Sequence, residues 1–105
     1  MPISLSDWAS AGIMPIPAHT AVTVTTNSGA ALAVNEKAKY RLLVNDSDTV
    51  MYVMLGATAV ANQGIRLNAA GGSFEMSMQG GNLWRGAINV IHGGTGNKIL
   101  LVTEA

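Results

Sequence analysis

The clearest pattern of hydrophobic and polar positions lies in residues 37–56. Apolar and polar residues alternate over residues 37–44, a period of two that is typical of a half-buried β-strand. This alternation predicts an inward face of Ala38, Tyr40, Leu42 and Val44 and a solvent-facing basic face of Lys37, Lys39 and Arg41. The short polar residues 45–48 then predict a turn. A second β-type run follows at residues 49–55, so we expect a β-hairpin.

The second run of this hairpin is apolar at odd and even positions alike, so both of its faces require cover. We therefore expect residues 50–55 to lie centrally in the fold. The cover is the C-terminal strand, the N-terminal arm or a neighbouring subunit. Residues 98–104 share this surplus of apolar surface.

Further strands are predicted at residues 20–26, 64–67, 73–78, 83–91 and 98–104, with turn clusters between them. Residues 30–34 predict a weaker edge strand or a loop. The aromatic residues Tyr40, Phe74 and Trp84 are expected in the core. Because no helical period is present, the chain is predicted to be all-β, an antiparallel β-sandwich or jelly-roll-like single domain over residues 20–105.

Residues 1–19 hold all three prolines together with apolar side chains, which predicts an extended N-terminal arm. Disordered segments are usually polar and charged, whereas this one carries apolar groups that are unfavourable in water. The arm is therefore expected to dock, either on its own domain or on another chain. The arm residues predicted at a subunit or capsid interface are Trp8, Ile13, Met14 and Ile16.

Composition narrows the choice of partners. The 105 residues suit one domain, and charged residues make up only 11% against a typical value of about 25%. Six basic and six acidic residues cancel, so nothing favours nucleic acid or an anionic membrane, and copies repel one another weakly. There is no cysteine for a disulfide or thiolate site. Neither a signal peptide nor a membrane-spanning apolar run is recognisable, so we expect a soluble, non-secreted protein.

Candidate chemistry is sparse. The glycine-rich residues 93–98 lack the residue order of a phosphate-binding loop, and Asp46 and Asp48 lack the spacing of a calcium loop. Neither His19 nor His92 has an acidic neighbour in sequence, which a working imidazole usually needs. Asn45 begins a glycosylation sequon. We therefore predict no enzyme, no cofactor and no metal site.

Several segments together resemble the small accessory structural proteins of tailed bacteriophages, especially capsid decoration (cement) proteins. They are residues 40–47 (YRLLVNDS), 52–56 (YVMLG), 64–67 (GIRL) and 98–105 (KILLVTEA), so the resemblance covers roughly residues 37–105. It implies a β-sandwich or jelly-roll domain that forms a homotrimer on the outer face of a capsid. Such a protein bridges major capsid protein subunits and sits on the virion after synthesis in the host cytoplasm.

A capsid decoration protein is therefore the leading functional hypothesis. The arm residues, together with Lys37, Lys39 and Arg41, are the expected contacts with the shell or with other copies. One alternative is another phage structural module, from a tail, baseplate or head fibre. A second alternative is a carbohydrate-binding β-sandwich, which would require exposed aromatic side chains such as Trp8 or Trp84.

Overall fold

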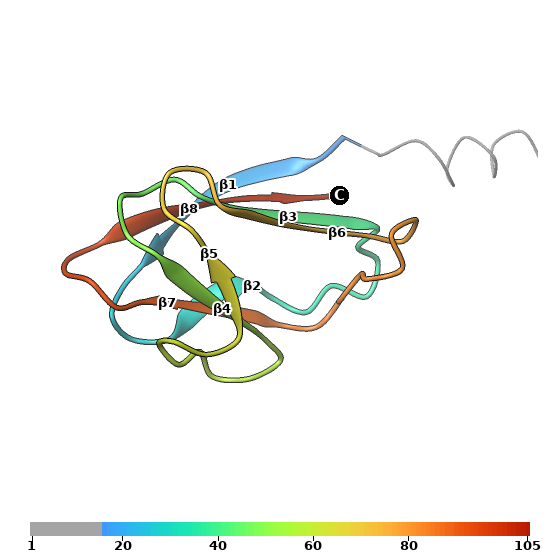
Figure 1. Cartoon of the computed structure of the whole chain (residues 1–105). Coiled ribbons are helices and arrows are strands. Elements are labelled where there is room, and N and C mark those ends of the chain that lie inside the picture. Colours follow the sequence, from blue (N-terminus) through green and yellow to red (C-terminus); the bar gives the residue numbers. More distant parts are fainter. Residues whose placement is uncertain (1–15) are drawn as a thin grey trace, which may run out of the picture.

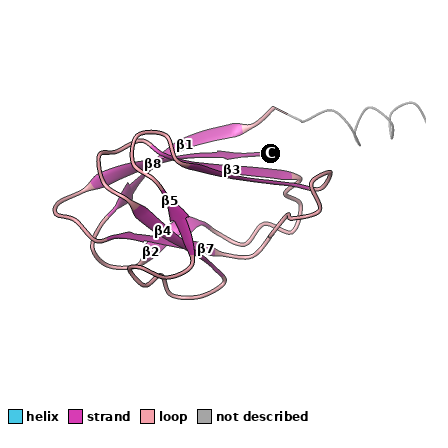
Figure 2. Ribbon diagram, viewed as in Figure 1, coloured by secondary structure: helices cyan, strands magenta, loops and turns pink. Residues whose placement is uncertain are grey.

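A computed structural model describes residues 16–105, and residues 1–15 lie outside the described part. The described residues form strands and loops without a helix (Figures 1 and 2). The strands are β1 (Ala18–Val24), β2 (Gly29–Leu32), β3 (Tyr40–Asn45), β4 (Met51–Leu55), β5 (Ile65–Leu67), β6 (Ser73–Ser77), β7 (Ile88–His92) and β8 (Lys98–Glu104).

The strands form two four-stranded antiparallel sheets that face each other (Figure 1). The first sheet has the order β1-β8-β3-β6 and the second has the order β2-β7-β4-β5. The pairing is nested, because β1 pairs with β8, β2 with β7, β3 with β6 and β4 with β5. The prediction of an all-β chain with two antiparallel sheets, as in a β-sandwich, is confirmed.

The predicted hairpin between β3 and β4 is wrong, because the two strands belong to different sheets. The buried side chain of Asn45 explains the crossing: its Nδ2 donates to the carbonyl oxygens of Thr49 (2.7 Å) and Leu67 (3.0 Å). Its Oδ1 accepts a bond from the Ser47 hydroxyl (2.6 Å). These bonds hold the polar turn as a corner between the sheets. The expected central position of β4 is confirmed, since it lies between β7 and β5.

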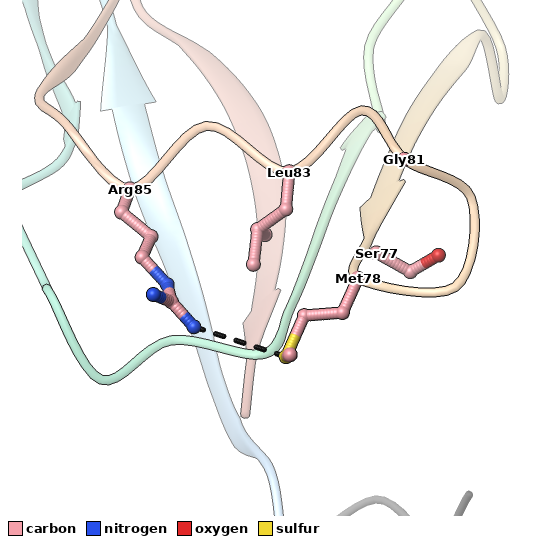
Figure 3. A pocket seen from close by; sticks show the side chains of 5 residues that line it. All are labelled: Ser77, Met78, Gly81, Leu83 and Arg85. Atoms are coloured by element: carbon pink, nitrogen blue, oxygen red, sulfur yellow. Dashed lines mark hydrogen bonds between the residues drawn. The ribbon is translucent and has the colours of Figure 1, made fainter. Parts of the chain in front are cut away.

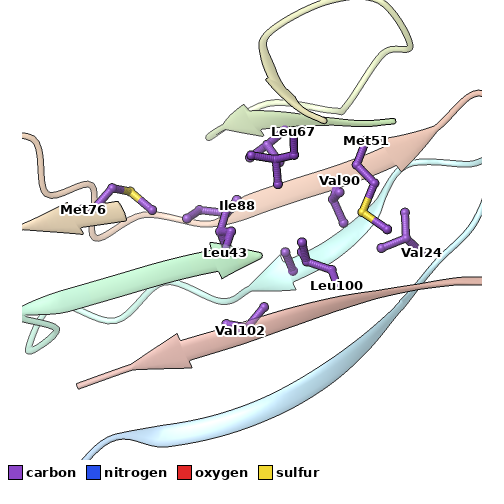
Figure 4. Close-up of a cluster of buried hydrophobic side chains, with 11 residues drawn as sticks. Val24, Leu43, Met51, Leu67, Met76, Ile88, Val90, Leu100 and Val102 are labelled. Carbon is purple, nitrogen blue, oxygen red and sulfur yellow. The ribbon is translucent and has the colours of Figure 1, made fainter. Parts of the chain in front are cut away.

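The core fills the space between the sheets and receives side chains from both of them (Figure 4). Leu43, Leu100 and Val102 come from the first sheet, and Met51 and Val53 face them from the second. Each of these five side chains is almost completely removed from water. The sandwich is therefore held mainly by burial of aliphatic and methionine side chains.

The face assignment of β3 is also wrong. Arg41, Leu43 and Asn45 point into the sandwich and are fully buried, whereas the predicted core residues Tyr40, Leu42 and Val44 stay partly exposed on the opposite side of the strand. Alternation separates two faces of a strand but does not say which one is inside. Here the face that carries a charge and an amide is the inner one.

Arg41 can be buried because every part of its guanidinium group has a partner. Its Nε donates to Glu104 Oε2 at 2.7 Å, which is also an ion pair. Nη1 donates to the carbonyl oxygens of Trp84 (3.0 Å) and Gly86 (2.7 Å), and Nη2 donates to that of Ala33 (2.7 Å). One side chain thus joins β3 and β8 to the loops before β3 and β7, and it closes this end of the sandwich.

The strand predicted at residues 83–91 begins only at Ile88. Trp84 lies in the preceding loop and is partly exposed, so the predicted core position is wrong. Its ring rests against Gly56 and Gly86, where a side-chain carbon would collide with the indole. Its Nε1 donates to the Ala87 carbonyl oxygen at 3.0 Å. The indole of Trp84 therefore packs on the backbone of loop residues and not inside the core.

Candidate interaction surface

The outer face of the first sheet, meaning its side that points away from the second sheet, carries a cluster of apolar side chains. The strand register places Ala21, Leu101, Val44 and Ser73 in one row across all four strands. Ile99 lies beside this row, and Ile99 and Leu101 keep 37% and 40% of their surface exposed. Contiguous apolar surface of this kind marks interaction sites more often than isolated exposed residues do.

The distribution of polar and apolar side chains on β3 also indicates that the outer face is an interaction surface. Its more apolar side, with Leu42 and Val44, contributes to the outer face, while Arg41 and Asn45 are turned into the interior. Buried charges require full pairing, and an exposed leucine or valine loses the benefit of burial. This arrangement becomes more favourable when another molecule covers the outer face.

The second sheet differs, because its own chain covers its outer side. Residues 56–64 fold across it (Figure 1) and are fixed by three hydrogen bonds. Asn89 Nδ2 donates to the Ala57 carbonyl oxygen (2.7 Å), and Ala59 N–H donates to Ser28 Oγ (2.8 Å). The Tyr52 hydroxyl donates to Asn62 Oδ1 (2.9 Å). Within residues 16–105, no comparable loop lies over the outer face of the first sheet.

Polar groups surround the apolar centre of that face. The Tyr40 hydroxyl donates to Glu75 Oε2 at 2.6 Å, and the bond to this carboxylate, helped by burial and by the negative charge, raises the pKa of Tyr40. His19 Nδ1 and Thr103 Oγ1 are hydrogen-bonded at 2.9 Å. An apolar centre inside a polar rim is the usual composition of a protein–protein interface.

A charged pair lies at the end of the sandwich, in the turn after β3. Lys98 Nζ donates to Asp48 Oδ1 at 2.8 Å, and this bond, followed by the bond from the Thr49 hydroxyl, lowers the pKa of Asp48. Both partners reach solvent, so the pair adds little stability. The carboxylate is already engaged by a cation of the same chain.

The residues predicted at the interface have different positions. Trp8, Ile13 and Met14 lie outside the described residues. Ile16 is almost fully exposed just before β1, and Lys37 and Lys39 are exposed in the connection from β2 to β3. Arg41 is buried, so it cannot belong to a surface contact.

The outer-face residues Leu42 and Val44 were missed because the pattern had assigned them to the core. The sequence did indicate that Ile99 and Leu101 need a partner, because they belong to the C-terminal run that is apolar on both faces.

A shallow, open pocket of about 300 Å³ lies beside the end of β6 (Figure 3). Ser77, Met78, Gly81, Leu83 and Arg85 line it. The Arg85 Nη2 group donates to the Met78 sulfur at 3.8 Å, and its Nε donates to the carbonyl oxygen of Ala38 at 2.7 Å. The lining therefore combines one cation, already bonded to the loop backbone, with two apolar side chains. It does not contain an acid–base pair.

The two histidines have separate roles. His92 is buried and accepts a hydrogen bond from the Gly94 N–H at Nδ1 (3.1 Å), while Nε2 donates to the Gly96 carbonyl oxygen (2.7 Å). It thus holds the turn between β7 and β8. The described residues contain no group of three potential metal ligands and no helix long and apolar enough to cross a membrane.

Comparisons of the chain with protein-family models, curated proteins and solved structures give no match. The functional interpretation therefore depends on the geometry of the outer face and on the sequence resemblance described above.

Proposed function

We propose that this protein is a structural virion protein that binds the outer surface of a tailed-bacteriophage capsid and stabilises it by bridging major capsid protein subunits. The apolar outer face of the first sheet, which no loop of residues 16–105 covers, carries this proposal. Leu42, Val44, Ile99 and Leu101 give it an apolar centre, and Glu75, which lies opposite Leu42 on β6, belongs to the polar rim. Covering that centre with a shell subunit would remove apolar surface from water, which is favourable at about 25 cal/mol per Å².

We also propose that the domain is a jelly roll. The nested pairing of β1 with β8, β2 with β7, β3 with β6 and β4 with β5 supports this fold, because it corresponds to one long hairpin wrapped into two sheets. Double-sheet jelly rolls of eight strands occur in viral capsid proteins and also in lectins. The fold is thus compatible with the decoration role and with the carbohydrate-binding alternative. The choice between them depends on the residues of the outer face and not on the fold.

The proposed role is mechanical and needs no catalysed reaction and no cofactor. Each copy would make a modest contact, and many copies on a lattice would add to a large gain in shell stability. The resemblance implies homotrimers that contact the major capsid protein on the virion surface. The arm residues Trp8, Ile13, Met14 and Ile16 remain proposed contacts, as do the exposed Lys37 and Lys39.

The test uses purified protein and capsids that lack it. We expect saturable, stoichiometric binding by co-sedimentation and a higher capsid disruption temperature by calorimetry. Leu101→Lys should abolish both effects, because it places a charge in the apolar centre. Val60→Lys is the matched control, since Val60 is equally exposed (42% against 40% for Leu101) but lies in the loop over the second sheet. Absence of both binding and stabilisation for the unmodified protein would refute the proposal.

Two other results would redirect the assignment. Electron microscopy that locates the protein in a tail, baseplate or head fibre would favour another phage structural module. A glycan-array signal that is lost in Trp84→Ala would favour carbohydrate binding. The packing of Trp84 against Gly56 and Gly86 and its bond to Ala87 give this side chain a structural role already.

A further inference from the structure

The two sheets have four edge strands, namely β1 and β6 in the first sheet and β2 and β5 in the second. An edge strand presents unpaired backbone N–H and C=O groups to any strand that approaches. Proteins protect such edges with short strands, bulges, charges, prolines or covering groups. Three of the four edges here are protected in one of these ways.

The edge of β6 is covered by a side chain. Asn82 Oδ1 accepts a hydrogen bond from the Ser77 N–H at 3.1 Å, and Asn82 Nδ2 donates to the Glu75 carbonyl oxygen at 2.9 Å. One amide side chain thus imitates the bonds of a neighbouring strand. Two of the backbone groups that a further strand would need are already occupied.

The edges of the second sheet are short. β2 has four residues, and its register with β7 shifts between Ala30 and Leu32. β5 has only three residues, Ile65–Leu67. A bulge and a short strand both limit pairing with another chain.

Within residues 16–105, the edge of β1 lacks these protections. The strand has seven residues, and its register with β8 is continuous from Ala18 opposite Glu104 to Val24 opposite Lys98. Its sequence, AHTAVTV, contains no lysine, arginine, aspartate, glutamate or proline. Its first four residues are all exposed. This combination is the one that favours strand addition.

We propose that β1 pairs in antiparallel fashion with β1 of a second copy of this chain, so that the two first sheets join into one continuous sheet. With three edges protected, residues 16–105 of each copy offer one open edge, and an open edge that meets itself generates a two-fold dimer. Centring the pair on Ala21 places His19 of one copy opposite Thr23 of the other. It brings no like charges face to face, and the balanced chain charge adds no long-range repulsion.

The outer face gives a second reason for choosing a copy of the same chain. Ala21 ends the row that runs through Leu101 and Val44, so pairing at β1 would continue this row into the Leu101 of the second copy. One face, four strands wide and about five residues long, covers roughly 300 Å² at the usual strand spacings. A stable interface buries about 800 Å² on each partner. The dimer would double the face and bring it closer to that size.

The test is the oligomeric state of the full chain in solution, which requires no capsid. Sedimentation equilibrium between about 10 µM and 1 mM should show the mass rising from 10.8 kDa toward twice that value. Ala21→Lys and Ala21→Glu should each weaken the dimer by up to about fivefold, because like charges would meet across the two-fold axis. An equimolar mixture of the two variants should restore dimers, since Lys would then face Glu. Ser73→Lys, in the same row at the opposite edge, should dimerise like the unmodified chain.

Several results would overturn the proposal. They are a monomer at 1 mM, a dimer unaffected by Ala21→Lys, and a mixture of the two charge variants that stays monomeric. A trimer, which is the state implied by the resemblance to capsid decoration proteins, would also overturn the two-fold dimer. Amide hydrogen exchange gives a readout without any substitution. Protection of residues 18–24 should rise with protein concentration, and protection that does not change would equally exclude pairing at β1. Neither measurement depends on capsid binding, so this inference and the decoration role can fail separately.

Discussion

Replacement of Arg41 by methionine tests the most unexpected feature of the core. Methionine keeps much of the side-chain volume but removes four hydrogen bonds, one to Glu104 and three to the carbonyl oxygens of Ala33, Trp84 and Gly86. A buried acceptor left without a donor costs about 1–3 kcal/mol, and breaking a buried ion pair costs about 3–5 kcal/mol. These two costs cannot simply be added, because both count the lost interaction with Glu104. The Glu104 side chain also stays 21% exposed, so water can replace part of that interaction.

We therefore expect Arg41→Met to lower the free energy of unfolding by about 3–5 kcal/mol, a large part of the roughly 5–15 kcal/mol typical of a domain. Urea unfolding followed by circular dichroism measures this loss, and the Tm should fall by at least about 12 °C. Arg41→Lys should recover only part of the stability, because an ammonium group cannot reproduce the guanidinium geometry. Lys39→Met, at an exposed neighbouring position, should change stability by less than about 0.5 kcal/mol. Equal, small losses in Arg41→Met and Lys39→Met would refute the burial of Arg41.

Three further predictions follow from the described contacts. Val53→Asn should cost about 3–5 kcal/mol in urea unfolding, because Val53 is fully buried in a central strand and the amide would lack partners; a mild effect would mean an edge position. The bond from Lys98 lowers the pKa of Asp48 below its unfolded value of about 3.9, so its contribution is present above that pH and is lost as the pH falls through the folded pKa. Between about pH 5 and pH 2 the unmodified protein should therefore lose more stability than Asp48→Asn, and parallel curves would contradict this sign. Asn82→Ala should uncover the edge of β6 and produce species larger than dimers in sedimentation, whereas an unchanged distribution would show that the amide does not protect this edge.

Much of the fold could be predicted from local patterns. Alternation and turn residues located most of the strands, the central position of β4 and the edge position of β2. These features depend on residues close in sequence and on the amount of apolar surface in each run. Such information suffices for strand positions and for the class of fold.

The failures at β3 have a common physical cause, which is long-range polar bonding. Three of the four partners that make Arg41 an interior residue, Trp84, Gly86 and Glu104, lie 43 or more residues from it in sequence. The corner after β3 depends on Asn45 reaching the carbonyl oxygen of Leu67. No local pattern contains these contacts, so the face of β3 and the path from β3 to β4 could not be derived from it. The outer face of Leu42 and Val44 was missed for the same reason.

Within residues 16–105, the exposed apolar side chains of a sheet face and the unprotected backbone groups of a strand edge occur together in the first sheet. The second sheet has a covered outer side and two short edges, while the first has an apolar outer face and the open edge of β1. A face and an edge point in perpendicular directions, so one copy could bind a shell through the face while pairing with another copy at the edge. Pairing would give two faces per particle and thus a higher avidity. Ala21→Lys should accordingly weaken capsid binding, both through the lost dimer and through the charge that it adds beside Leu101, whereas Leu101→Lys should remove capsid binding even when dimers still form.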